Sequence, residues 1–133
     1  MDKKIRDSLN DISPDSPAAE EAKKRAFPVP YIREGTLAGE LEAALVNNNG
    51  FTVILPEWTA VQPNAREIFF IIYAENGPMP ELTELMPFDG MEIIHYVGKD
   101  EIDSPFLRGN TVTLFGIVYP EAWQTARTSY QVI

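Results

Sequence analysis

Three carboxylates fall within four consecutive residues, which makes this segment the first candidate for a metal site. They are Asp100, Glu101 and Asp103. Calcium prefers oxygen ligands but takes about six to eight of them, and the spacing is not that of an EF-hand loop. Asp89 and Glu92 would have to approach from a neighbouring loop to complete the shell. A solvated acidic loop explains the same residues more simply, and we expect no metal to bind.

His95 is the single histidine of the chain, and cysteine is absent. These counts exclude zinc sites built from several imidazoles, thiolate metal sites, disulfides and cysteine nucleophiles. His95 shares its predicted strand face with Met91, Ile93 and Val97, which is typical of a neutral histidine within a core or at its edge. Paired carboxylates can hydrolyse glycosides, but no acid is set in an apolar pocket by its neighbours in sequence. We therefore predict no enzyme, no catalytic residue and no cofactor.

Three aromatic residues could form a surface that stacks on sugars. They are Trp58, Tyr119 and Trp123. Trp123 lies in the predicted hairpin 120–125, where an exposed indole would be a good contact residue, because tryptophan is enriched at interface anchors. The alternative, which we favour, is a tryptophan folded back over the end of the domain.

The elements that must position these residues are strands. Runs rich in Val, Ile, Phe, Tyr and Thr alternate with Pro, Gly and Asn after residue 30. They predict strands over 31–37, 51–55, 66–73, 91–97, 111–119 and 128–133, with a helical turn over 40–46. No long amphipathic helix follows a strand, which argues for antiparallel sheets. The predicted fold is an antiparallel β-sandwich of about seven strands over residues 31–133.

The alternation of apolar residues predicts a core shared by these strands. Its expected members are Val53, Leu55, Ile68, Phe70, Ile72, Ile93, Val112, Leu114 and Val118. In the run 111–119 both faces are partly apolar. This strand is therefore either central and covered on both sides, or it meets a partner with one face.

Charge divides the chain near residue 27. The first 27 residues hold six basic and six acidic groups, so the formal charge of -9 lies entirely in the remainder. The first part contains no run of strand-forming residues. It shows two short helix signals: one covers residues 16–25, and the other is a stripe of apolar residues with helical spacing. The stripe consists of Ile5, Leu9 and Ile12. We predict a partly helical N-terminal arm over residues 1–30, which packs on another chain or on a sheet face of its own domain.

The C-terminal half resembles immunoglobulin-like sandwich domains of bacterial surface proteins and of phage structural proteins. The resemblance rests on strand residues 94–97, on Glu101-Ile102-Asp103-Ser104-Pro105-Phe106-Leu107, on 109–119 and on 129–133, with Val53-Ile54-Leu55-Pro56 upstream. It implies an immunoglobulin-like sandwich and no activity. The antibody-type cysteine pair is absent, and Trp58 follows a strand instead of lying within one.

The acidic balance disfavours nucleic acid and anionic membrane surfaces as partners, because binding phosphate needs a basic patch. No signal peptide begins the chain, and the longest apolar run is far shorter than the roughly 20 residues of a membrane span. We therefore expect cytoplasmic synthesis. The predicted function is a structural or assembly protein, such as a phage or virion accessory protein, whose arm binds protein partners in an oligomer. The alternatives are an adhesin-like or carbohydrate-binding module and an acidic inhibitor or immunity-type protein.

Overall fold

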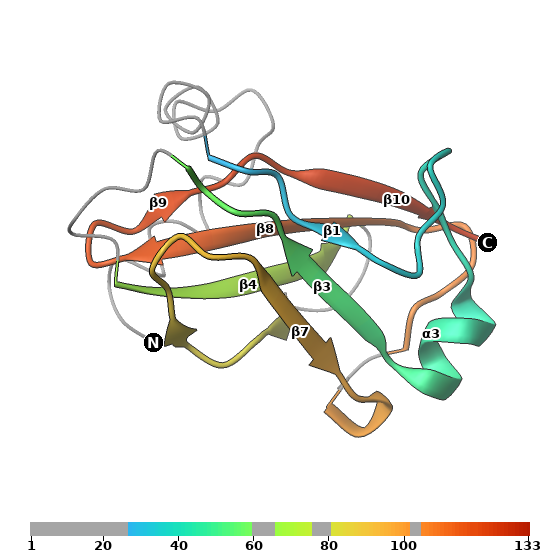
Figure 1. Ribbon diagram of the computed structural model, residues 1–133. Helices are drawn as coiled ribbons and strands as arrows, with labels where there is room; N and C mark the ends of the chain where they lie inside the picture. The colour runs from blue at the N-terminus through green and yellow to red at the C-terminus, as the bar shows by residue number, and fades with distance from the viewer. Residues whose placement is uncertain (1–26, 60–65, 76–80, 102–104) are drawn as a thin grey trace.

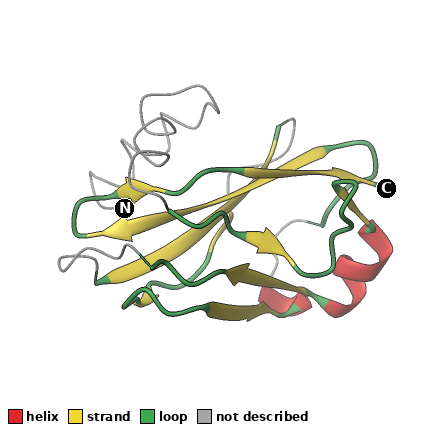
Figure 2. Cartoon of the chain, turned by 45° about the horizontal axis from the view of Figure 1, so that its top comes forward, coloured by secondary structure: helices red, strands yellow, loops and turns green. Residues whose placement is uncertain are grey.

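The described residues form ten strands in two sheets. The computed structural model describes residues 27–59, 66–75, 81–101 and 105–133. The small sheet has the order β1 (Tyr31–Ile32), β3 (Phe51–Leu55) and β7 (Ile93–Val97). The large sheet contains the other seven strands. The two sheets lie over one another in Figure 2.

The large sheet is built on its two longest strands. The central path runs β2 (Glu40–Leu41), β10 (Thr128–Val132), β8 (Thr111–Tyr119), β4 (Glu67–Ala74) and β5 (Glu81–Leu82). β6 (Met86–Pro87) pairs with β4, and β9 (Trp123–Gln124) pairs with β8. All pairings are antiparallel except that of β10 with β2.

Helix is limited to two short segments in the described part of the chain. Helix α3 (Ala43–Asn49) follows β2, and the 3₁₀ turn η1 (Lys99–Glu101) follows β7. Gly50 ends α3 with a φ of 79°, and its amide donates to the Val46 carbonyl. The positive φ favours glycine here because a side chain would be strained. No helix in these described ranges is long and apolar enough to cross a membrane.

The core lies between the sheets, as the alternation predicted. Val53 and Leu55 of β3 face Ile68, Phe70 and their neighbours on the large sheet in one buried cluster. Of the nine predicted core residues, eight are buried, and Ile93 is partly buried against the same cluster. β8 is central and buried on both faces, which decides between the two alternatives for this strand.

A tyrosine from the large sheet reaches across to the small sheet. The Tyr130 hydroxyl accepts a hydrogen bond from the Ile32 amide at 2.9 Å. Next to it, the Thr128 hydroxyl donates to the Pro30 carbonyl at 2.6 Å. Burial raises the pKa of Tyr130 above its ordinary value, and the hydrogen bond to Ile32 opposes that shift. These contacts fasten β1 to the large sheet through side chains.

Several boundaries differ from the sequence-based expectation. The prediction of about seven strands is too low, because five of the ten observed strands have only two residues. The expected strand 31–37 shortens to β1, since the chain turns at Arg33–Gly35. The helical turn expected at 40–46 begins later, because residues 40–41 pair with β10. The predicted arm 1–30 lies largely outside the described residues. Phe27, at its end, packs in the core.

Candidate functional site

A cleft opens where the edges of the two sheets come together. β7 is an edge of the small sheet, and β5 is an edge of the large sheet. The cleft has a volume of about 380 Å³ and is lined by Ile72, Thr83, Glu84, His95, Tyr96, Val97 and Glu101. That volume lies within the range of small-ligand sites, roughly 300–1,000 Å³.

Buried apolar side chains form the inner wall of the cleft. Ile72 of β4 and Val97 of β7 are both buried and belong to the inter-sheet core. Ile72 pairs with Leu114 in the centre of the large sheet. A ligand entering the cleft would therefore meet a fixed apolar surface.

His95 lies on the inner side of β7. It pairs with Val53 of β3, whose side chain is in the core. Ile93 and Val97, two residues away on either side, also pack against the core, so the strand alternation directs His95 inward. It is only partly buried because β7 is an edge strand. The imidazole thus borders the cleft, in agreement with the predicted core-edge histidine.

Thr83 is held by the backbone of β4. Its amide donates to the Phe70 carbonyl at 3.0 Å, and its hydroxyl accepts from the Phe70 amide at 2.9 Å. The hydroxyl hydrogen is directed to the Glu84 carbonyl at 3.3 Å. These three bonds continue the pairing of β5 and fix the backbone from which Glu84 projects.

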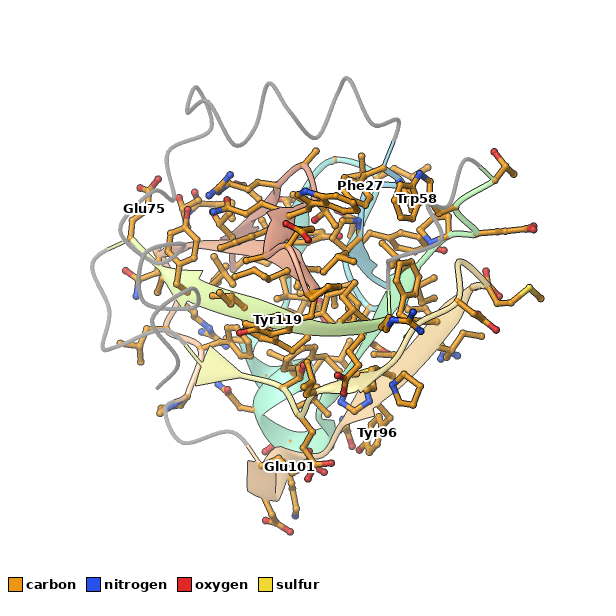
Figure 3. All side chains as sticks on the ribbon, turned by 90° about the vertical axis from the view of Figure 1, so that its left-hand side faces the viewer. Phe27, Trp58, Glu75, Tyr96, Glu101 and Tyr119 are labelled. Carbon is orange, nitrogen blue, oxygen red and sulfur yellow. The ribbon has the colours of Figure 1, made fainter. Side chains whose placement is uncertain are left out.

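Tyr96 and Glu101 form the outer part of the cleft. The Tyr96 hydroxyl donates a short hydrogen bond to the Asn49 carbonyl at the end of α3, which fixes its ring. The Glu101 amide donates to the Gly98 carbonyl at 2.9 Å, which closes η1. Both side chains are exposed, and they appear together at one end of the molecule in Figure 3.

The cleft lining is acidic and lacks a basic partner. Glu84 and Glu101 are both exposed carboxylates, and none of the described residues that line the cleft is Lys or Arg. The charge of the domain has the same sign, because the first 27 residues are electroneutral and the whole chain carries -9. The cleft therefore presents negative charge and one imidazole beside the buried side chains of Ile72 and Val97, with Tyr96 at its outer border.

The acidic loop considered as a calcium site does not form one in the described residues. Asp100 and Glu101 are exposed in η1, and Asp103 lies outside the described residues. Asp89 borders a separate, more open hollow with Arg66, Pro87 and Phe88, and its carboxylate accepts from the Met91 amide. The structure brings only Glu101 of this group into the cleft.

The three aromatic residues considered as a sugar platform do not share a surface. Trp58 is only 2% exposed and packs in the inter-sheet core, with its ring 4.2 Å from that of Phe27. Trp123 packs against the same cluster. Tyr119 lies on the outer face of the large sheet beside Phe69. Trp58 and Phe27 lie together at the opposite end of Figure 3 from Tyr96.

Sequence analysis missed Thr83 and Glu84 as cleft residues. They follow the Pro-rich connection and belong to no strand or motif that would single them out. Only an indirect signal was available. His95 lies on the inward face of its strand, and that strand is at the edge of its sheet. Only the strand order shows which segment lies opposite.

Comparison with known proteins gives two similar structures and no family. No protein-family model matches the sequence. No curated protein matches it. Two solved structures of superoxide reductase (neelaredoxin) from Ignicoccus hospitalis, one of them a variant, cover 87% of this chain and 90% of their own. Both are 16% identical to it, with TM-scores of 0.45 and 0.46.

These matches correct the expectations drawn from the sequence resemblance. The structures found are superoxide reductases, so the assignment to immunoglobulin-like domains of surface or phage proteins is wrong. The same comparisons contradict the predicted non-enzymatic structural, virion or assembly role with its alternatives, since both structures found are named as superoxide reductases. The motifs behind the resemblance are ordinary strand and turn residues, which many β folds share.

The described residues of this chain do not fit a transition-metal centre that could deliver an electron to superoxide. Such a centre needs several imidazole, thiolate or carboxylate ligands at one point. The chain has one histidine and no cysteine. Within the described ranges, no group of three His, Cys, Asp or Glu side chains could hold a metal ion.

Proposed function

We propose that the cleft between β7 and β5 binds a small organic cation with an apolar body. The observation that carries this proposal is the joint presence of two carboxylates, Glu84 and Glu101, in a cleft whose described lining has no basic side chain. Carboxylates attract a cation and accept its hydrogen bonds.

The inner wall selects for a ligand with an apolar part. Ile72 and Val97 at the cleft floor are each only 6% exposed, and an apolar part of a ligand would cover the small apolar surface that they leave in contact with water. A hydrated inorganic ion would gain nothing there. The favoured ligand class is therefore an alkyl or aryl ammonium compound.

His95 supplies a further polar group at the cleft. An imidazole carries two ring nitrogens that can take part in hydrogen bonds, so it can hydrogen-bond a polar substituent of the ligand. In this role His95 orients the ligand, while the two carboxylates provide the attraction.

Calorimetric titration tests the proposal. The full-length protein is titrated with phenethylammonium and, as the matched anion, with phenylacetate. We expect binding of the cation alone, weakened several-fold in Glu84→Gln and in Glu101→Gln. The matched control is Glu121→Gln, an exposed glutamate outside the cleft, which should bind like the wild type. Equal binding of cation and anion, or unchanged affinity in both cleft variants, would overturn the proposal.

A further inference from the structure

A second apolar cluster lies on the side of the large sheet that faces away from the small sheet. It consists of Phe69, Ile71, Phe115 and Ile117 and is called the outer cluster here. The register places Phe69 opposite Ile117 and Ile71 opposite Phe115, so the four side chains form one contiguous patch on β4 and β8. Their neighbours along each strand point the other way, into the inter-sheet core.

The outer cluster is excluded from water. Its four side chains have relative exposures of 0% to 3%. Side chains stand roughly perpendicular to a sheet, so neighbouring strands flank them but do not cover them. Burial of this degree requires a further layer of atoms above the sheet.

The described hydrophobic residues packed against the outer cluster lie at its rim. They are Tyr73 of β4, Tyr119 of β8 and Ala122 of the turn between β8 and β9. The Arg127 guanidinium, 4.3 Å from the Phe115 ring centroid, also comes from the large-sheet side, between β9 and β10.

We infer that residues 1–26 of the same chain cover the outer cluster. The other segments outside the described residues, 60–65, 76–80 and 102–104, have at most six residues each. Each of them must also connect two fixed ends, which leaves few residues to form a layer. Only the N-terminal segment has the length for it.

The N-terminal segment joins the domain near one end of β8, a strand that carries two residues of the outer cluster. Phe27 packs between Trp58 and Trp123, with ring centroids 4.2 Å and 6.3 Å away. Trp123 belongs to β9 and pairs with Val118 of β8, next to Ile117 of the outer cluster. Phe27, Trp123 and Val118 all belong to the inter-sheet core, so the segment starts on the inner side of the large sheet beside the end of β8 and would have to pass around that end to cover the outer cluster.

The composition of the segment also suits the patch. Its larger apolar side chains, Ile5, Leu9 and Ile12, are spaced as one stripe of a helix. Packing this stripe on the outer cluster would bury both apolar surfaces at once and offset the conformational entropy of ordering the segment.

Photocrosslinking in the full-length chain tests the inference. Benzoylphenylalanine replaces Tyr73, an aromatic residue at the rim of the outer cluster, and the products are analysed by denaturing electrophoresis and peptide mass spectrometry. We expect a product of monomer mass with the crosslink in residues 1–26. The control position is Tyr96, on the small sheet, where no crosslink to this segment is expected. A crosslinked dimer, or crosslinks that avoid residues 1–26, would overturn the inference.

A charge substitution in the stripe gives a second, independent test. Ile5→Asp with Leu9→Asp should lower the crosslinking yield from position 73 several-fold and increase binding of a dye that detects exposed apolar surface. Leu37→Asp, at a fully exposed leucine, is the matched control and should change neither. Unchanged yield in the double variant would contradict packing through this stripe.

Discussion

The Phe27 ring lies 4.2 Å from the Trp58 ring, between centroids, and the two planes are tilted by 39°. Trp58 is stacked on its other side with Phe88 at 6.1 Å. Its amide donates to the Gly90 carbonyl at 2.7 Å. This stack joins the first described residue to the segment after β3 and to the segment after β6 within the inter-sheet core.

Truncation of this stack should destabilise the domain. Trp58→Ala removes a fully buried indole and leaves a cavity, for which we expect a loss of about 3–5 kcal/mol in the free energy of unfolding. Urea denaturation measures it. Tyr96→Ala, which removes an exposed ring, is the control and should cost far less. Equal losses in the two variants would show that Trp58 does not stabilise the core.

Gly35 is predicted to tolerate no side chain. A Cβ at this position would collide with the ring of Tyr130, which is itself held by its hydrogen bond to Ile32. We expect Gly35→Ala to cost about 1–3 kcal/mol, the usual penalty for overpacking. The matched variant is Gly98→Ala, where the nearest atoms are at ordinary contact distance, 3.5 Å and 3.7 Å. Thermal unfolding of both should show a lower Tm for Gly35→Ala alone.

The raised pKa of Tyr130 predicts a loss of stability in alkaline solution. Burial disfavours the phenolate in the folded protein, so the unfolded chain releases its proton at a lower pH than the folded chain does. The contribution of Tyr130 is complete below the unfolded pKa of about 10 and decreases as the pH rises above it toward the folded pKa.

Comparison with a phenylalanine variant isolates this effect from the other tyrosines. Tyr130→Phe loses the hydrogen bond to the Ile32 amide and should be less stable than the wild type near neutral pH. Its free energy of unfolding should decline less steeply between pH 9 and pH 11, roughly the range in which a tyrosine titrates. Parallel curves for the two proteins would contradict the burial of the Tyr130 hydroxyl.

Leu114 should contribute more to stability than its exposed neighbours. It is fully buried in the centre of β8, and Leu114→Ala should cost about 3–4 kcal/mol. Leu107→Ala, at a half-exposed leucine in a loop, is the control. A loss below about 1 kcal/mol for Leu114→Ala would mean that the strand faces are assigned wrongly.

The long strands were predictable from sequence because they depend on local patterns. The run 111–119 became β8 with the same bounds, and 51–55 became β3, since turn residues mark their ends and β-branched residues fill them. The two-residue strands were not predictable in this way. β2 and β9 exist only because a longer strand already lies beside them.

The cleft depends on information that local patterns do not hold. His95 could be assigned to an inward strand face, but its neighbours Thr83 and Glu84 come from the far edge of the other sheet. Trp58 shows the same limit: it follows a strand and suggested a surface residue, whereas its burial results from Phe27 and Phe88 on both sides.

The single histidine allows a direct test of ligand binding in the cleft. Because the chain has one imidazole, its ring protons give one set of NMR signals, and His95 borders the cleft. Titration with phenethylammonium at constant pH should shift these signals with a saturable dependence, and the shift should be much weaker with phenylacetate or in a Glu84→Gln, Glu101→Gln double variant. His95 signals that stay unmoved by the cation, or that move equally with the anion, would contradict a cation-binding cleft.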